Sequence, residues 1–377
     1  MMVKNKKINL GIVLPILLLA IVSIVTIYSA SSYISKSMGN LALKQSVWYL
    51  IGIILVIILV KIKNEYLYSH TWILYIFGNI LLFFLLLFAP EINNSKCWFV
   101  IPGIGSFQPS EFMKIFLMLT LATMIHNFRA ESEDPTIKEE FIFILKTLII
   151  LLIPSVLTFL QPDTGSVIIY FIIYFAMMFA SGIRARWFII AFIILALILG
   201  TIFGIYFLND KLFISFFGNN LFYRFERIFN WSSGSGLQLE NAKAAIGSAG
   251  LFGHGFNNTP IYFPEAGTDF IFAVFASNFG LFGSFLLISL IVFLDVKIVL
   301  LAKKKILDTD KYILVGIVAM LVFQQIQNIG MTVGLLPITG ITLPFISYGG
   351  SSLLSYMIIV GSLINISMEK PHKYRYK

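Results

Sequence analysis

Long apolar stretches recur along this chain, and short polar segments separate them. Ten stretches reach or approach the roughly 20 apolar residues that a helix needs to cross a bilayer. They cover residues 10–30, 47–60, 71–90, 110–127, 141–160, 164–181, 187–208, 269–294, 312–333 and 348–367. The strict alternation of a membrane β-barrel does not occur. The pattern predicts an all-α polytopic membrane protein with about ten transmembrane helices, forming a single membrane domain over residues 1–377.

The composition agrees with an integral membrane protein, since 58% of the 377 residues are hydrophobic and only 12% are charged. The N-terminus has a basic start, but its apolar core is too long for a signal peptide and no small-residue cleavage site follows, so we expect a retained first helix. Cys97 is the only cysteine, which excludes an intrachain disulfide or a thiolate metal cluster.

Charge sets the expected orientation. If the N-terminus lies inside the cell, most of the 27 Lys and Arg residues fall on the cytoplasmic side, as cationic loops resist translocation. Both termini are then cytoplasmic. The net charge of +9 describes a surface that faces anionic lipid, and it requires no nucleic acid.

The acidic residues divide less evenly between the two sides: seven fall on the outer side, and Glu111 lies just inside the fourth expected helix. The longest outer connection, about 209–268, lies between the seventh and eighth expected helices and carries several of them. A structureless loop of that length is uncommon, so we expect a large extracellular loop with short helices of its own. Any chemistry should face outward.

Two arginines stand out in this loop. In "FYRFERIFNW", Arg224 and Arg227 alternate with aromatic residues, which suits a helix lying in the membrane interface. The same guanidinium groups could clamp a diphosphate through bidentate hydrogen bonds. Both interpretations stay open. The glycines of "AIGSAGLFGHGF" further on allow close backbone approach to a ligand, or simply tight turns.

Thr268 and Asp269 sit where the eighth helix should begin, and both residue types are good N-caps. From the residues alone, capping is favoured over catalysis. Glu265, after Pro264, reads as a solvated loop acid by the same logic.

Other polar residues lie at helix starts. Glu111 and Lys114, in "FQPSEFMK", share one helical face and form a simple ion pair, although ionisable groups within a membrane tend to have a role. Asp163, in "LQPDTGS", should cap the next outward-facing helix start. Ser351 could bind ligand or cap the last helix. The Gly- and Pro-containing "NIGMTVGLLPITGITLPFISYGGSS" before it suggests a re-entrant segment buried within protein.

Five motifs together carry a family resemblance. "FQPSEFMK", "QPDTG", "AIGSAGLFGHGF", "PEAGTDFIFAV" and "NIGMTVGLLPITGITLPFISYGGSS", in this order, resemble the SEDS family of shape, elongation, division and sporulation proteins (RodA, FtsW and SpoVE). The match runs from about residue 98 to 367. "NIGMTVGLLPITG" resembles the cell-elongation branch, RodA, more than the division branch, FtsW.

The resemblance implies a peptidoglycan glycosyltransferase in the cytoplasmic membrane of a bacterium. It would polymerise lipid II on the outer face, with a class B penicillin-binding protein as its transpeptidase partner. Asp269 matches the essential aspartate of the family, and Glu111 and Lys114 match residues that shape its central cavity. Asp163 matches the Gln-Pro-Asp turn.

The resemblance also gives a mechanism to expect. Asp269 would act as the base that takes a proton from the acceptor sugar, while Arg224, Arg227, Lys243 or a divalent cation (Mg²⁺ or Mn²⁺) stabilises the departing diphosphate. Glu265 would orient the sugar or bind the metal.

The sequence departs from the family in places. "GLQLENAKAAIGS" replaces the usual Gly-Tyr-Gln-x-x-Gln-Ser run, Gly267 stands where histidine is common, and Ser277 and Asn278 replace a Glu-Glu pair.

Two functions of other classes remain alternatives. A flippase for lipid-linked precursors would also use ten helices and an intramembrane ion pair, although no inverted repeat is evident. A non-catalytic scaffold of a division or sporulation complex is the other, and Asp269 argues against it.

Overall fold

The computed structural model describes residues 9–31, 40–92, 95–101, 105–132, 134–229, 236–304 and 309–368, without the side chains of residues 220, 221, 224, 227–229 and 236. Its elements are α1 (Leu10–Ser31), α2 (Leu41–Ile62), α3 (Asn64–Ser69), α4 (Thr71–Phe88), β1 (Phe99–Ile101), β2 (Gly105–Phe107), α5 (Pro109–Glu131), α6 (Ile137–Leu160), α7 (Thr164–Ala180), α8 (Ala185–Leu208), α9 (Asp210–Phe229), α11 (Gly236–Ser248), α12 (Ile271–Lys303), α13 (Thr309–Thr332) and α14 (Gly350–Met368).

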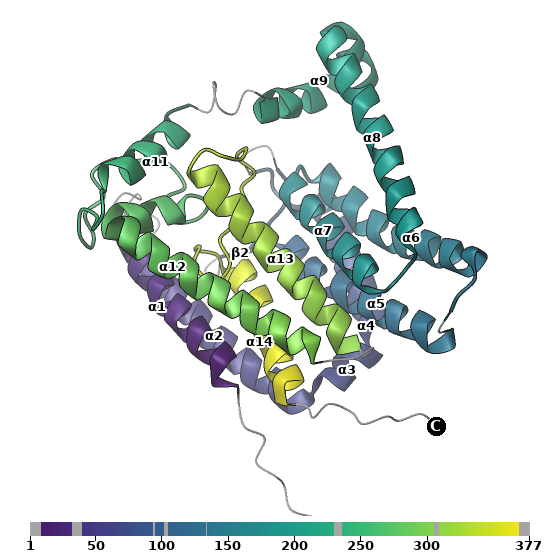
Figure 1. The fold of residues 1–377 in the computed structure, drawn as a ribbon. Coiled ribbons are helices and arrows are strands. Elements are labelled where there is room, and N and C mark those ends of the chain that lie inside the picture. Colours follow the sequence, from purple (N-terminus) through teal and green to yellow (C-terminus); the bar gives the residue numbers. More distant parts are fainter. Residues whose placement is uncertain are drawn as a thin grey trace, which may run out of the picture.

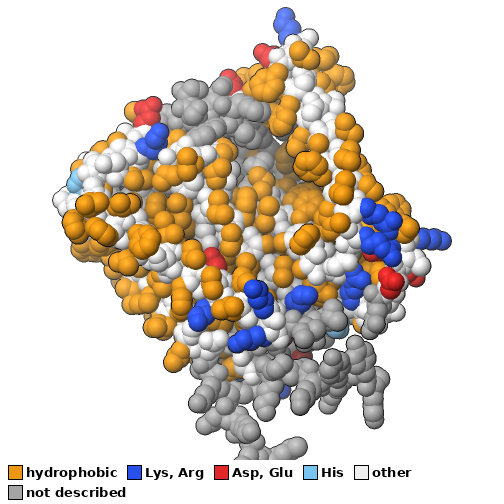
Figure 2. Space-filling view, in the orientation of Figure 1, with side chains coloured by type: hydrophobic (Ala, Val, Ile, Leu, Met, Phe, Trp, Pro, Cys, Tyr) orange, Lys and Arg blue, Asp and Glu red, His pale blue; other side chains and the backbone are white. Residues whose placement is uncertain are grey.

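A helix occupies each of the ten predicted apolar stretches, so the predicted helical membrane fold is confirmed. Eight of the helices in the described ranges are long and apolar enough to cross a membrane, and α5 and α7 match the remaining two stretches. The number of crossings stays a prediction. In Figure 2, apolar side chains spread over the helical body while Lys and Arg side chains collect along its lower margin and one corner, as expected for a membrane protein with one cationic surface.

The core lies around α13 and α14, which have the largest buried share of the spanning helices. α14 packs against α2, α13 against α7, α4 against α5, and α1 against α12. By contrast, α8 has no buried residue, and Figure 1 shows it extending from the body with α9 at its outer end.

Some boundaries differ from the sequence expectation. α2 begins at Leu41, earlier than the predicted 47, because Asn40 caps it and the polar Gln45 is buried. The Gln45 side chain donates hydrogen bonds to Ser23 Oγ and to the Ser347 carbonyl, both at 3.3 Å. A polar residue is thus tolerated inside the helix because protein groups satisfy it. The short antiparallel β1–β2 hairpin was not predicted.

In α6, a hydrogen bond from a neighbouring helix replaces the one that a proline removes. Pro154 lacks an N–H, so the carbonyl of Ile150, four residues earlier, loses its helical partner. The Tyr75 hydroxyl on α4 donates a 2.9 Å hydrogen bond to that carbonyl. This bond ties α4 to α6 where the bilayer offers no water.

The long connection between α8 and α12 contains helices α9 and α11, and its location outside the cell stays a prediction. Its glycine-rich part packs tightly on α12: a Cβ built on Gly253 would lie 2.3 Å from the Asn278 carbonyl oxygen. The close backbone approach that the glycines suggested is therefore made to the protein's own chain.

Candidate functional site

The turn before α12 carries Asp269, and its geometry overturns the capping interpretation. α12 begins at Ile271 with Phe270 in the cap position, and no side chain makes a capping hydrogen bond there. Residues 271–278 are all buried, and Gly280, with φ 64°, breaks the helix soon afterwards. The Asp269 side chain therefore does not serve the helix start, because the chain enters α12 one residue later than a cap would require.

The backbone around Asp269 is held from two directions. The Asp269 carbonyl accepts a 2.8 Å hydrogen bond from Asn328 Nδ2 on α13. The two preceding carbonyls accept from the segment before α14: Thr268 O from Ser347 Oγ at 2.6 Å, and Gly267 O from Tyr348 N at 2.9 Å. Three consecutive carbonyls are thus satisfied by elements far away in the sequence, which places this turn rigidly.

The Asp269 carboxylate faces Gly340, since a Cβ built on that glycine would lie 3.6 Å from Asp269 Oδ2. Within the described residues, no hydrogen bond or ion pair is formed by this carboxylate. Burial, and secondly the charge of Glu265, raise the pKa of Asp269 to about 7. A carboxyl with that pKa can both accept and hold a proton near neutral pH.

Glu265 belongs to the same turn. Its backbone has φ 54°, and its carbonyl accepts from the N–H groups of Thr268 and Phe270. The exposed Glu265 side chain accepts a 2.7 Å hydrogen bond from the Thr268 hydroxyl. Two carboxylates are therefore brought together, one exposed and one half-buried.

Glu111 and Lys114, in the first turns of α5, form an ion pair. Lys114 Nζ lies 2.6 Å from Glu111 Oε2, and both side chains are buried. Ser355 on α14 donates to Glu111 Oε2 at 3.4 Å, and Lys114 Nζ lies 6.0 Å from the ring centre of Tyr356. The local ion pair expected from the sequence is thus present, at the junction of α5 and α14.

Tyr356, beside this pair, belongs to a group of buried polar side chains on α13 and α14. The Tyr356 hydroxyl accepts a 3.0 Å hydrogen bond from Gln324 Nε2 and lies 3.3 Å from Thr342 Oγ1. One turn along α13 from Gln324, Asn328 donates to the Ile341 carbonyl as well as to Asp269. The sequence reasoning missed Gln324, Asn328 and Tyr356. The available signal was the group of four amides in a long membrane-type helix, in which Gln324 and Asn328 are four residues apart on one face.

Asp163 does act as the N-cap of α7, accepting from Ser166 N at 3.0 Å. Its other oxygen accepts from Gln108 Nε2 at 3.1 Å and from Ser110 Oγ at 2.9 Å. Ser351, at the start of α14, accepts from Gln108 N at 3.0 Å. These hydrogen bonds join the N-terminal ends of α5, α7 and α14.

The cationic residues of the outer loop are placed differently. Lys243 is exposed on α11 and reaches over Gly334, where a built Cβ would lie 3.5 Å from Lys243 Nζ. Arg224 and Arg227 belong to α9, but their side chains lie outside the described residues. Over the described ranges, no three His, Cys, Asp or Glu side chains gather as a metal-binding group.

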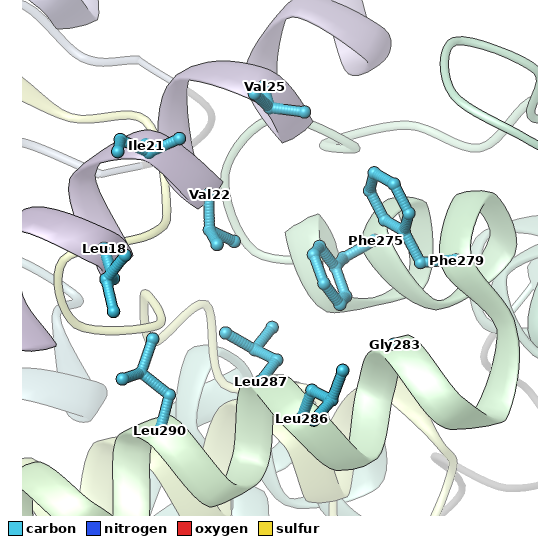
Figure 3. A pocket seen from close by; sticks show the side chains of 10 residues that line it. All are labelled: Leu18, Ile21, Val22, Val25, Phe275, Phe279, Gly283, Leu286, Leu287 and Leu290. Atoms are coloured by element: carbon cyan, nitrogen blue, oxygen red, sulfur yellow. The ribbon is translucent and has the colours of Figure 1, made fainter.

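A groove between α1 and α12 is the other notable feature of this region, with a volume of about 380 Å³. Figure 3 shows Val22 of α1 opposite Phe275 and Leu287 of α12, and all lining residues are apolar or glycine. Such a groove suits a hydrocarbon chain. It offers no group for proton transfer, so the candidate chemistry lies at Asp269.

Comparison with known proteins agrees with this architecture. A chain of a peptidoglycan synthase complex, studied for the coordination of polymerization and crosslinking, superposes with a TM-score of 0.78 at 25% identity, covering 96% of this chain and 97% of that chain. RodA from Thermus thermophilus superposes with a TM-score of 0.69 at 25% identity, covering 96% of each chain.

Sequence comparison gives the family. The probable peptidoglycan glycosyltransferase FtsW of Lactococcus lactis is 30% identical over 404 residues, spanning 98% of this chain and 94% of the relative. The family model described as "Cell cycle protein", for FtsW, RodA and SpoVE, matches residues 10–372. The protein is therefore a multi-pass membrane protein that belongs to the FtsW/RodA/SpoVE (SEDS) family.

Proposed function

We propose that this protein is a peptidoglycan glycosyltransferase that polymerises lipid II into glycan strands on the outer face of the cytoplasmic membrane. A relative matched over 94% of its length carries the name probable peptidoglycan glycosyltransferase FtsW, and the family membership supports the same activity here. The single observation that carries the mechanism is the Asp269 carboxylate, fixed by its backbone and free of a partner among the described side chains.

In the proposed reaction, the 4-hydroxyl oxygen of the acceptor sugar attacks the anomeric carbon of the lipid-linked donor. The new C–O bond forms as the bond to the diphosphate breaks with inversion, the diphosphate leaves with the electron pair, and the hydroxyl proton passes to Asp269. A pKa of about 7 matches this task, because the carboxylate is available near neutral pH and still basic enough to take the proton. A positioned base contributes roughly 10²- to 10⁴-fold to the rate.

The other site residues predicted from the sequence have supporting roles in this proposal. Lys243, Arg224 and Arg227 would stabilise the diphosphate, which as a good leaving group needs no second protein acid. Glu111, Lys114, Asp163 and Ser351 would shape the cavity rather than react, since they are engaged with one another or with neighbouring elements.

The exposed Glu265 carboxylate, which has no ion-pair partner in the described structure, is also a chemically suitable ligand for Mg²⁺ or Mn²⁺. A bound cation would neutralise charge on the diphosphate. We expect a chelator to stop polymerisation, added Mg²⁺ or Mn²⁺ to restore it, and Glu265→Gln to raise the cation concentration needed. Full activity in chelator would remove the cation from the proposal.

The proposal extends to the partner and to the branch of the family. A class B penicillin-binding protein as partner fits the likeness to a chain of a peptidoglycan synthase complex. A role in cell elongation rests on the RodA-like motif, whereas the relative compared above is an FtsW, so the branch stays a prediction.

The test is glycan polymerisation from purified lipid II by the protein with its partner transpeptidase. Asp269→Asn keeps the size of the side chain and removes the base, so we expect at least a 10²-fold loss of polymer. The matched control is Asp295→Asn, about 22 Å along α12 beyond the Gly280 break, where the carboxylate only accepts from Gln325. Undiminished polymer from Asp269→Asn would contradict the mechanism and favour a scaffold or a flippase, which vesicle transport of labelled lipid II distinguishes.

A further inference from the structure

Asn328 lies where α13 meets both the Asp269 turn and the segment that leads to α14. Its side chain is fully buried. The single Nδ2 group donates two hydrogen bonds, each of 2.8 Å, to the carbonyls of Asp269 and Ile341. One amide thus joins two non-helical segments that are more than 70 residues apart in the chain.

The orientation of this amide is determined by its partners. Two carbonyl acceptors require an N–H₂ group, and a flipped amide would set oxygen against oxygen. The other atom, Asn328 Oδ1, is buried without a hydrogen-bond partner among the described residues. Burying Asn328 Oδ1 without a hydrogen bond costs free energy. The side chain therefore contributes to the structure mainly through the two hydrogen bonds that Nδ2 donates.

The bridge acts on the carboxylate indirectly. Asn328 bonds to the backbone of Asp269 and makes no hydrogen bond to the carboxylate itself. On the other side of the turn, Ser347 Oγ donates to the Thr268 carbonyl at 2.6 Å and accepts from Leu343 N at 2.8 Å. The turn is therefore clamped between α13 and the 341–348 segment, and the carboxylate is directed toward Gly340 in that same connection.

We propose that Asn328 is a positioning residue: by bridging the carbonyls of Asp269 and Ile341, it holds the Asp269 carboxylate in its reactive position. This inference rests on the proposed function, in which Asp269 is the base. Loss of the bridge should allow the turn to relax and water to reach the carboxylate. Misplacement by about 1 Å costs on the order of 10²-fold in rate.

The chain offers a matched control one residue away. Gln327 Nε2 also donates to a carbonyl of the α13–α14 connection, that of Pro337, at 2.8 Å, but it makes no bond to the Asp269 turn. Gln327→Leu therefore removes a bond of the same kind and length to the same connection. Any effect specific to Asn328→Leu reports on Asp269 rather than on general anchoring.

The experiment compares polymerisation by Asn328→Leu, Ser347→Ala and Gln327→Leu, each in complex with the partner and with lipid II as substrate. We expect Asn328→Leu to lower kcat on the order of 10²-fold with little change in KM. Ser347→Ala should act in the same direction, and it keeps the test informative if Asn328→Leu does not fold. Asn328→Gln, which retains the donor, should recover part of the activity.

The pH dependence of kcat distinguishes a positioning role from a merely structural one, because a merely structural role would leave that dependence unchanged. Hydration of the carboxylate lowers its pKa toward that of an ordinary Asp, so the acid limb of kcat should move to lower pH in Asn328→Leu and Ser347→Ala, and stay in place in Gln327→Leu. Equal behaviour of the Asn328 and Gln327 variants, or a lower kcat with an unmoved limb, would overturn the inference. Full activity in Asp269→Asn would instead remove the proposed function itself.

Discussion

Lys114 Nζ donates a 2.6 Å hydrogen bond to Glu111 Oε2 inside the first turns of α5, and neither side chain has appreciable contact with solvent. Taking both charges out of water is costly, so each depends on the other. Ser355 of α14 adds a hydrogen bond to the same Glu111 oxygen. The pair therefore holds α5 and α14 together beneath the outer site.

Removing one member of this pair should destabilise the fold strongly. Glu111→Gln leaves the Lys114 ammonium buried without a countercharge, which costs about 3–5 kcal/mol. We expect a lower midpoint of thermal unfolding in detergent, with the loss of activity following the loss of folded protein.

The double variant Glu111→Gln with Lys114→Met is the control, because it removes both charges. It should recover much of the stability lost in the single variant, since a buried ion pair replaced by neutral groups is often close to neutral in stability. A double variant as unstable as the single one would show that the pair is not mutually dependent.

Gly253 provides a second test, on the contact between the glycine-rich loop and α12. Its φ of 80° favours glycine, and a Cβ would lie 2.3 Å from the Asn278 carbonyl oxygen. Gly253→Ala should therefore cost at least about 1–3 kcal/mol and displace the loop, which increased proteolysis within residues 249–258 would report.

Gly247→Ala is the matched substitution. Gly247 lies in α11 with nothing within 4 Å of a built Cβ, and alanine favours a helix more than glycine does. This variant should be as stable as the parent or slightly more so. Equal proteolysis of the two variants would argue against the close packing of Gly253.

Much of this fold follows from apolar length alone. Each expected span contains a helix because a long run of apolar residues has one efficient way to satisfy its backbone in lipid. The Asp163 cap and the Glu111 to Lys114 pair were also predictable, because both depend on residues within four positions of each other. Local chemistry of this kind is visible in a sequence.

The surroundings of Asp269 could not be obtained in that way. The capping interpretation was wrong because α12 begins at Ile271, one residue later than a cap at Asp269 requires, after a turn in which Glu265 has a positive φ. What holds the turn comes from Asn328 and Ser347, 59 and 79 positions from their acceptors. Such contacts depend on how α13 and the segment before α14 pack, and no local pattern encodes them.

The central claim is that Asp269 acts as the base, and the pH dependence of polymerisation tests it most directly. Burial and the charge of Glu265 both favour the protonated form, so kcat should rise with pH through about 7 as the carboxylate becomes free to take a proton. Neutralising Glu265 removes the smaller of the two causes that raise the Asp269 pKa, so the acid limb of the pH profile of kcat should move to lower pH. Burial should still keep that limb above the usual pKa range of Asp.

The measurement is kcat for glycan polymerisation from lipid II, from well below to well above pH 7, for the parent protein and Glu265→Gln in the same partner complex. The account predicts an acid limb near pH 7 in the parent and a lower one in the variant. A profile without that limb, or a limb that does not respond to Glu265→Gln, would contradict the assignment of Asp269 as the base.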